Sequence, residues 1–276
     1  RFGKVILGYP GGCCIGKRPI DLHEQTLSAM GAVFCEKENY LEAECDCLEG
    51  CDLYLPYSSV GVTENILLAA AGASGMTRIY GAAREPEIVE LCNYLICMGV
   101  LMEGVGSDVL IIKGTKELSS CDYCNVYDRI VAGTYLLMAA AIPSKIKLIG
   151  IENICYIKNI MNVAALLGVN MVHIDNYLSV ESFGNVQGGA FKTGLYPEFP
   201  TDLQPVLMTV LAGAVEDSTL VETVFEKRFQ IVTELIKLGA DIDVKGQRAQ
   251  IKGGCHLQGH TVKATDLRQG AALVVA

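Results

Sequence analysis

The 276-residue sequence lacks any uninterrupted run of about 20 apolar residues, the length that a membrane-spanning helix needs. Residues 1–19 also lack the long apolar core of a secretory signal, because a Gly-Gly-Cys-Cys run and several charges interrupt them. Basic residues are scarce: 22 Lys and Arg stand against 31 Asp and Glu, a formal net charge of −9. Nucleic-acid binding requires clustered basic residues. We therefore expect a cytoplasmic protein with neither a membrane nor a nucleic acid as partner.

Paired metal-ligand motifs are also missing, although the chain has 12 cysteines. Cys121 and Cys124 form a single CxxC, and the four histidines are scattered. A structural zinc site typically takes two such pairs, or a Cys pair with a His pair. Cys92 and Cys97 lie inside apolar helical patterns, which is typical of reduced thiols that pack as small apolar groups. We expect no metal ion.

An internal repeat of about 70 residues is present. Apolar helical patterns end at four glycines spaced 68, 69 and 71 residues apart: Gly31, Gly99, Gly168 and Gly239. Glycine suits the C-terminal end of a helix because it enters the left-handed region without strain. Two short strands are predicted after each glycine, as at residues 108–114 and 249–253.

A second, alanine-rich helix is predicted in each copy of the repeat. Its starts carry residues that cap or charge a helix N-terminus, near Thr63, Asp128, Thr201 and Thr265. A strand is predicted after the first three of these helices. The repeat is therefore helix, strand, helix, hairpin, which suits a domain built from several copies of one α/β unit. The copies are cut at both ends of the sequence, so we expect the natural protein to be longer on both sides.

Residues 9–23 combine a glycine-rich turn with a thiol and basic side chains. A proline followed by two glycines predicts a turn or a mobile loop. This loop presents Cys13 close to Lys17 and Arg18, whose positive charge favours the thiolate. A cysteine in a glycine-rich loop is more often inert than catalytic, so the residues alone leave both interpretations open.

The full run of residues 10–23 resembles the active-site loop of the UDP-N-acetylglucosamine 1-carboxyvinyltransferase family, whose pattern is P-G-G-C-x-I-G-x-R-P-x-D-L-H. Every fixed position of this pattern is met. Further blocks that resemble the family follow in the family's order, at residues 59–61, 82–89, 128–130, 199–202, 222–229 and 264–268. The resemblance thus covers essentially the whole chain.

The resemblance implies an α/β fold of two similar domains, each an inside-out α/β barrel of repeated βαβαββ units. The active site would lie in the cleft between them. Residues 1–126 would form part of the first, catalytic-loop domain, and residues 127–276 part of the second. A Lys-Asn pair and an arginine would lie upstream of Arg1, and a phosphate-binding arginine downstream of Ala276. By this resemblance the chain is truncated at both ends and lacks part of the cationic site. We therefore expect it to be inactive by itself.

The implied activity is transfer of the enolpyruvyl group of phosphoenolpyruvate to the 3′-hydroxyl of UDP-N-acetylglucosamine, with release of phosphate. This would be the first committed step of peptidoglycan synthesis, and so of cell-wall biogenesis, cell shape, division and the cell cycle, and a target of fosfomycin. Both substrates are small molecules, and the reaction takes no metal or organic cofactor. Cys13 would protonate the donor's methylene carbon, and Asp202 would accept the proton of the sugar hydroxyl.

The remaining site residues are also carried over from the family's motifs. The uracil end of the nucleotide would be held by Arg18, Pro19, Ile20, Asp21 and Leu22. The diphosphate would contact Ser59, Val60 and Gly61, and the nucleotide would also contact Val224. The second-rank candidates are His23, Arg228, Asp266 and Arg268. Of these, Arg228 could also have a structural role or hold a loop in place.

Several alternatives remain open at the level of sequence. Ser59 also fits an ordinary helix cap. Asp128, Asp202 and Asp266 all precede alanine-rich helices, where the helix dipole alone stabilises a carboxylate. The shikimate-pathway enolpyruvyl transferase uses the same fold and donor, but lacks the cysteine loop and the RPIDLH block. The last alternative is a truncated, non-catalytic paralogue that binds a UDP-sugar or nothing.

Overall fold

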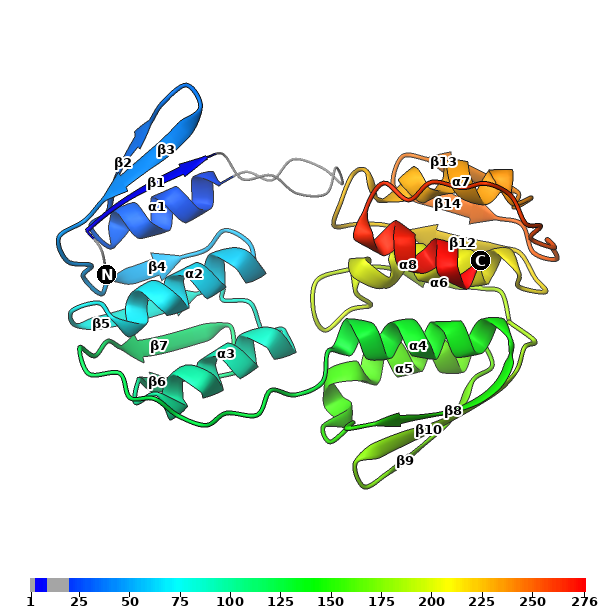
Figure 1. Cartoon of the computed structure of the whole chain (residues 1–276), viewed down its shortest axis with the longest axis horizontal. Coiled ribbons are helices and arrows are strands. Elements are labelled where there is room, and N and C mark those ends of the chain that lie inside the picture. Colours follow the sequence, from blue (N-terminus) through cyan, green and yellow to red (C-terminus); the bar gives the residue numbers. More distant parts are fainter. Residues whose placement is uncertain (1–2, 9–19) are drawn as a thin grey trace. The chain divides into compact units, whose positions relative to one another are not determined.

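The computed structural model describes residues 3–8 and 20–276, and these form two compact units (Figure 1). Unit 1 comprises residues 3–8 and 20–125, and unit 2 comprises residues 126–276. Each unit has its own hydrophobic core: one cluster of buried residues lies within 22–112 and the other within 130–272.

Unit 1 is built from helices and two separate sheets. Its helices are α1 (Asp21–Ala29), α2 (Val60–Ala71) and α3 (Pro86–Cys97). One sheet has the order β1-β3-β2, with β1 (Lys4–Gly8), β2 (Val33–Glu36) and β3 (Tyr40–Glu44) all antiparallel. The other has the order β4-β5-β7-β6, with β4 (Asp52–Tyr54), β5 (Met76–Tyr80), β6 (Leu101–Glu103) and β7 (Val109–Lys113). In this second sheet β4 and β5 are parallel, and the other pairs are antiparallel.

Unit 2 repeats this arrangement. Its α-helices are α4 (Arg129–Ala141), α5 (Lys158–Leu166), α6 (Gln204–Ala212), α7 (Val232–Lys237) and α8 (Leu267–Val275), and its 3-10 helices are η1 (Ile154–Ile157), η2 (Thr201–Leu203) and η3 (Arg228–Ile231). One antiparallel sheet has the order β8-β10-β9, with β8 (Pro143–Ile149), β9 (Asn170–Ile174) and β10 (Tyr177–Phe183). The other has the order β11-β12-β14-β13, with β11 (Ala190–Lys192), β12 (Ser218–Val221), β13 (Ile242–Lys245) and β14 (Arg248–Ile251), and β11 pairs parallel with β12.

The predicted repeat is confirmed. The four glycines follow the ends of α1, α3, α5 and α7 and have φ angles of 103°, 101°, 94° and 99°. An antiparallel hairpin follows each of them. The two four-stranded sheets belong to complete βαβαββ units, β4-α2-β5-α3-β6-β7 and β11-α6-β12-α7-β13-β14. The three-stranded sheets have the same strand order without the leading strand.

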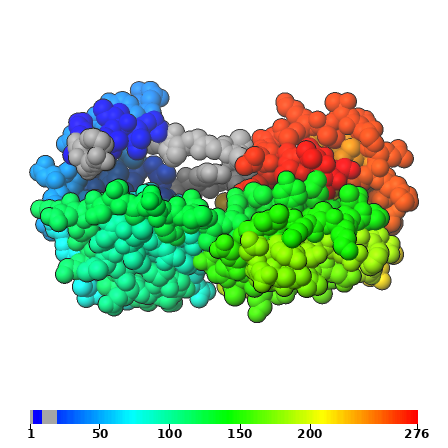
Figure 2. Space-filling model, turned by 60° about the horizontal axis from the view of Figure 1, so that its bottom comes forward, coloured from blue at the N-terminus to red at the C-terminus, as the bar shows by residue number. Residues whose placement is uncertain are grey.

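The alanine-rich helix α6 occupies the interior of unit 2. All nine residues of α6 are buried, and α6 packs against both α4 and α8. Figure 1 shows α4, α6 and α8 side by side, with the sheets of unit 2 outside them. Figure 2 shows α8, in red, reaching the surface of unit 2 beside the orange segments of the same unit. Helices inside and sheets outside are the arrangement expected from the resemblance, although the described strands form four separate sheets rather than a closed barrel.

One predicted helix start is wrong. The alanine-rich helix expected near Thr63 begins at Val60, with Ser59 as its N-cap. Thr63 lies within the first turn instead, where its hydroxyl donates to the Ser59 carbonyl at 2.8 Å. Serine and threonine are both suitable capping residues, so the sequence pattern did not distinguish them. Val60 and Gly61 therefore belong to the helix rather than preceding it.

Candidate functional site

Asp202 lies in η2, directly before α6, and its carboxylate contacts two arginines of unit 2. Nη2 of Arg268 donates to Oδ2 at 2.9 Å, and Nη2 of Arg228 donates to Oδ1. The side chain of Arg228 is 3% exposed, whereas that of Asp202 is 37% exposed. The structure thus brings three of the predicted site residues together. It leaves part of the carboxylate open to solvent while two guanidinium groups fix its orientation.

The other two candidate carboxylates are helix caps. Oδ1 of Asp128 accepts hydrogen bonds from the amides of Ile130 and Val131 at 2.7 and 3.0 Å. Oδ1 of Asp266 accepts from the amides of Arg268 and Gln269 at 2.8 and 2.9 Å. These contacts satisfy amides that a helix N-terminus otherwise leaves unpaired. Asp266 also fixes the start of α8, from which Arg268 reaches Asp202, so it supports the site indirectly.

The predicted nucleotide contact Val224 is joined to the Asp202 segment by Glu222. The amides of Val224 and Phe225 donate to Oε1 of Glu222 at 2.8 and 3.1 Å. The Thr201 hydroxyl donates to Oε2 of the same carboxylate at 3.0 Å. Sequence reasoning placed Glu222 in a family block but gave it no role. A buried glutamate resembles an ordinary exposed one in the sequence, and only its 1% exposure distinguishes it.

In unit 1, Ser59, Val60 and Gly61 form the N-terminal turn of α2. Oγ of Ser59 accepts from the amide of Val62 at 3.5 Å, which is long for a hydrogen bond. Ser59 is therefore a capping residue, as the alternative interpretation held, but it makes a weak cap. A helix N-terminus of this kind presents backbone amides to an anion.

The N-terminal end of α1 packs beside this turn. A Cβ placed on Gly61 would lie 3.6 Å from Cε1 of His23, and Nδ1 of His23 lies 2.6 Å from Nδ2 of Asn65 in α2. Burial lowers the pKa of His23, and the charge of Asp21 opposes this shift. The structure thus brings the blocks 20–23 and 59–61 together within unit 1.

The first residues of α1 differ in exposure. Asp21 is exposed and Ile20 is half-buried, whereas Leu22 is 6% exposed and belongs to the core of unit 1. A contact between Leu22 and a ligand would therefore involve its backbone. The predicted site residues Cys13, Arg18 and Pro19 lie outside the described residues.

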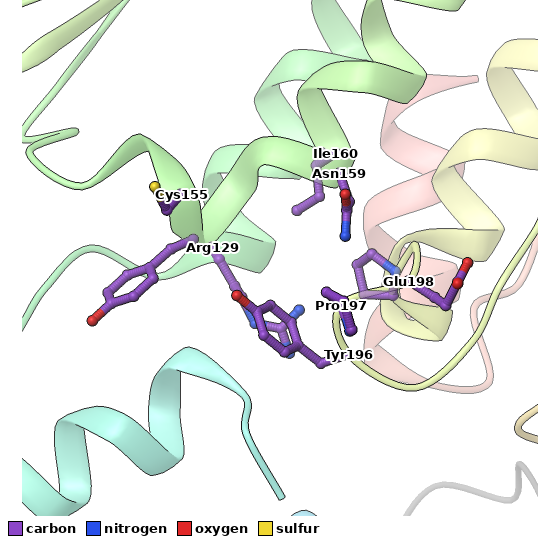
Figure 3. Close-up of a pocket in the computed structure, with 9 residues that line it drawn as sticks. Arg129, Cys155, Asn159, Ile160, Tyr196, Pro197 and Glu198 are labelled. Carbon is purple, nitrogen blue, oxygen red and sulfur yellow. The ribbon is translucent and has the colours of Figure 1, made fainter. Parts of the chain in front are cut away.

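A small hollow in unit 2 borders the 199–202 segment through Pro200, and its cavity volume is about 10 Å³. Figure 3 shows Arg129 beside the ring of Tyr196, and the guanidinium carbon lies 5.9 Å from the ring centroid. Asn159 and Glu198 also line the hollow. Small-molecule sites typically measure roughly 300–1,000 Å³. The hollow is thus too small to hold a nucleotide sugar by itself.

Residues 3–8 and 20–276 contain no cluster of three or more His, Cys, Asp or Glu side chains placed to hold a metal ion. Over the same ranges, no helix has both the length and the apolar character that crossing a bilayer demands.

Comparison with known proteins identifies the family. The sequence model of the EPSP synthase (3-phosphoshikimate 1-carboxyvinyltransferase) family matches residues 2–276. The chain is 42% identical over 278 residues to "UDP-N-acetylglucosamine 1-carboxyvinyltransferase 1" of Caldanaerobacter subterraneus subsp. tengcongensis, and 42% identical over 275 residues to "UDP-N-acetylglucosamine 1-carboxyvinyltransferase 2" of Clostridium tetani. All of this chain is covered in both cases, and it spans 66% of the length of each relative.

Solved structures show the same fold. The enolpyruvyl transferase NikO from Streptomyces tendae superposes with a TM-score of 0.87 at 20% identity, over 100% of this chain and 66% of NikO. EPSP synthase from Acinetobacter baumannii superposes with a TM-score of 0.69 at 18% identity, over 99% of this chain and 66% of that protein. The chain belongs to the EPSP synthase (3-phosphoshikimate 1-carboxyvinyltransferase) family of enolpyruvyl transferases, and its sequence is similar to UDP-N-acetylglucosamine 1-carboxyvinyltransferases.

Proposed function

We propose that the full-length protein transfers the enolpyruvyl group of phosphoenolpyruvate to the 3′-hydroxyl of UDP-N-acetylglucosamine and releases phosphate. The observation that carries this proposal is the 42% identity, over the whole chain, to relatives named for that reaction. The complete loop pattern of residues 10–23 supports it from the sequence. The shikimate-pathway reaction is the second candidate, because the family model carries its name.

The proposed chemistry is an addition followed by an elimination. The sugar hydroxyl oxygen bonds to C2 of phosphoenolpyruvate while the Cys13 thiol delivers a proton to C3. The Cys13 thiolate then takes a proton back from C3 while the bond between C2 and the phosphate oxygen breaks, which gives the enolpyruvyl ether and phosphate. Asp202 accepts the hydroxyl proton. A carboxylate has about four acceptor positions, so its bonds to Arg228 and Arg268 leave room for the substrate.

Substrate binding is proposed for residues of both units. Arg18, Pro19, Ile20, Asp21 and Leu22 hold the uracil end, the N-terminal turn of α2 at 59–61 meets the diphosphate, and Val224 contacts the nucleotide. His23 packs against that turn and orients it. An acidic chain of net charge −9 needs such local donors to bind two anionic substrates. By this proposal the protein works in the cytoplasm, in peptidoglycan synthesis, and so affects cell shape and division.

Phosphate release by the full-length protein tests the reaction. With phosphoenolpyruvate as donor, we expect release when UDP-N-acetylglucosamine is present and background release without it. Release with shikimate 3-phosphate instead would assign the second candidate reaction. Binding of UDP-N-acetylglucosamine without any release would identify a non-catalytic paralogue.

Mass spectrometry after exposure to the epoxide fosfomycin tests the role of Cys13. We expect a single adduct on Cys13, because the thiolate is the nucleophile and the neighbouring Lys17 and Arg18 favour it. Cys92 provides the internal control, since burial raises the pKa of its thiol to about 11 and keeps it protonated. Labelling of Cys14 in place of Cys13, or of neither, would contradict the proposed role of the loop.

A further inference from the structure

We propose that Glu222 is a positioning residue that holds Asp202 and Val224 in one arrangement. This inference rests on the proposed function, in which Asp202 accepts a proton and Val224 contacts the nucleotide. Glu222 comes directly after β12 and is 1% exposed. A carboxylate this buried is costly unless its oxygens are hydrogen-bonded. Its contacts therefore show what it organises.

One oxygen of Glu222 fixes the backbone around Val224. Oε1 accepts from the amides of Val224 and Phe225 at 2.8 and 3.1 Å. These two amides are two and three residues from the carboxylate that they bind, so the contact closes a tight turn. The turn sets the position of the Val224 side chain, which is half-buried.

The other oxygen of Glu222 begins a path to Asp202. Oε2 accepts the Thr201 hydroxyl at 3.0 Å. Because the hydroxyl donates to Glu222, its lone pairs face Nε of Arg228, which donates to Oγ1 of Thr201 at 3.2 Å. Nη2 of the same guanidinium then donates to Asp202.

The hydrogen bonds that lead from Asp202 through Arg228 and Thr201 to Glu222 all have a fixed donor and acceptor. The Thr201 hydroxyl donates to the acceptor-only carboxylate of Glu222 and accepts from the donor-only guanidinium of Arg228, so its orientation is fixed. The planar guanidinium of Arg228 carries this orientation to Asp202, since its donors are held in one plane. Arg228 also lies with its guanidinium carbon 5.2 Å from the centroid of the Phe225 ring, which is on the turn that Glu222 closes. Both branches from Glu222 therefore meet at Arg228.

Formal charges in this cluster balance. The carboxylates of Glu222 and Asp202 are matched by the guanidinium groups of Arg228 and Arg268. Glu222 and Arg228 are buried, and a cluster with matched charges and directed hydrogen bonds has few alternative arrangements. Glu222 thus acts on the reaction through other residues and does not itself touch a substrate.

Three substitutions in the full-length protein test the inference. Thr201→Val keeps the size of the side chain and leaves both amide bonds to Glu222 intact, but cuts the path to Arg228. We expect kcat to fall roughly tenfold while KM for UDP-N-acetylglucosamine stays within about twofold. Glu222→Gln removes the charge that accepts both the Thr201 hydroxyl and the amides around Val224. We therefore expect kcat to fall at least as much as in Thr201→Val and KM for UDP-N-acetylglucosamine to rise about fivefold. Thr201→Ser restores the hydroxyl and should recover most of kcat.

Glu226→Gln is the matched control, because Glu226 is an exposed glutamate four residues away. We expect its kcat and KM to equal those of the wild type. Thr201→Val and Glu222→Gln proteins that behave like this control would overturn the positioning role, as would failure of Thr201→Ser to recover activity. Absence of phosphate release from the wild-type protein is a different result, because it refutes the proposed function itself.

Discussion

Asp202 and Arg228 form an ion pair in which the cation is buried and the anion is half-exposed. The difference in exposure gives the two residues different roles. Arg228 is held by the interior of unit 2 through Thr201, so its position is set by the fold. Asp202 takes its orientation from that fixed cation while part of its carboxylate remains accessible. An accessible, oriented carboxylate is what acceptance of a proton from a bound substrate requires.

Asp202→Asn is expected to lower kcat by about 10² to 10⁴, because an amide cannot accept the hydroxyl proton. KM for UDP-N-acetylglucosamine should change by less than about threefold, since the amide oxygen still accepts from an arginine. Steady-state kinetics of phosphate release by the full-length protein measure both parameters. Asp128→Asn is the matched control: asparagine caps helices as well as aspartate, so its kcat should be that of the wild type. A larger effect on KM than on kcat would make Asp202 a binding residue.

Gly99→Ala is expected to destabilise unit 1 by about 1–2 kcal/mol, because its φ of 101° is strained for any residue with a Cβ. The new methyl group would meet its nearest atom, the Glu117 carbonyl oxygen, only at 3.9 Å, so the cost is conformational rather than steric. Gly72→Ala is the control. Gly72 follows α2 with φ −108° and open space around it, so alanine there should be neutral or stabilising. Urea unfolding compares the two, and equal effects would contradict this explanation.

Gln204→Met is expected to stabilise unit 2 by about 1 kcal/mol. Gln204 is fully buried in α6, and within the described part of the chain neither its Nε2 nor its Oε1 has a hydrogen-bond partner. An unsatisfied buried polar group costs about 1–3 kcal/mol, and methionine has a similar shape without that cost. Thr209→Val in the same helix should destabilise instead, because the Thr209 hydroxyl donates to the Pro205 carbonyl at 3.1 Å. Thermal unfolding measures both, and a lower melting temperature for Gln204→Met would contradict the prediction.

His23→Gln is expected to reduce the loss of stability on acidification. Burial lowers the pKa of folded His23 below its ordinary value of 6.5, so the unfolded chain binds a proton first as the pH falls. The stability associated with neutral His23 is therefore complete above pH 6.5 and is lost as the pH falls from there through the folded pKa. Urea midpoints between pH 7.5 and 5.5 should fall less steeply in the variant. Identical slopes would show that His23 is not desolvated.

The features predicted correctly from the sequence are those that depend on neighbouring residues. Gly31, Gly99, Gly168 and Gly239 end their helices because a single backbone conformation favours glycine there, whatever surrounds it. The hairpins after these glycines were also predicted correctly, because their short strand patterns are local to the sequence. The start of α2 was misplaced because Ser59 and Thr63 are equally good caps in sequence, and the residues between them gave no further signal.

The arrangement of the site required the folded chain. Asp202 meets one arginine 26 residues away and another 66 residues away, and no sequence pattern spans those intervals. The helix-start pattern alone does not distinguish Asp128, Asp202 and Asp266, and only the resemblance favours Asp202; the structure adds that Asp128 and Asp266 bind helix amides. Glu222 was missed because charged residues are normally exposed, and its burial depends on strands and turns from separate parts of unit 2.

The two separate hydrophobic clusters have a consequence for measurement. Because each unit has its own core, we expect calorimetry of this protein to give two transitions rather than one. Substitutions at Gly99 and His23 should then shift one heat-absorption peak, and those at Gln204 and Thr209 the other. A single midpoint assigned to the whole chain would average the two and conceal which half had changed.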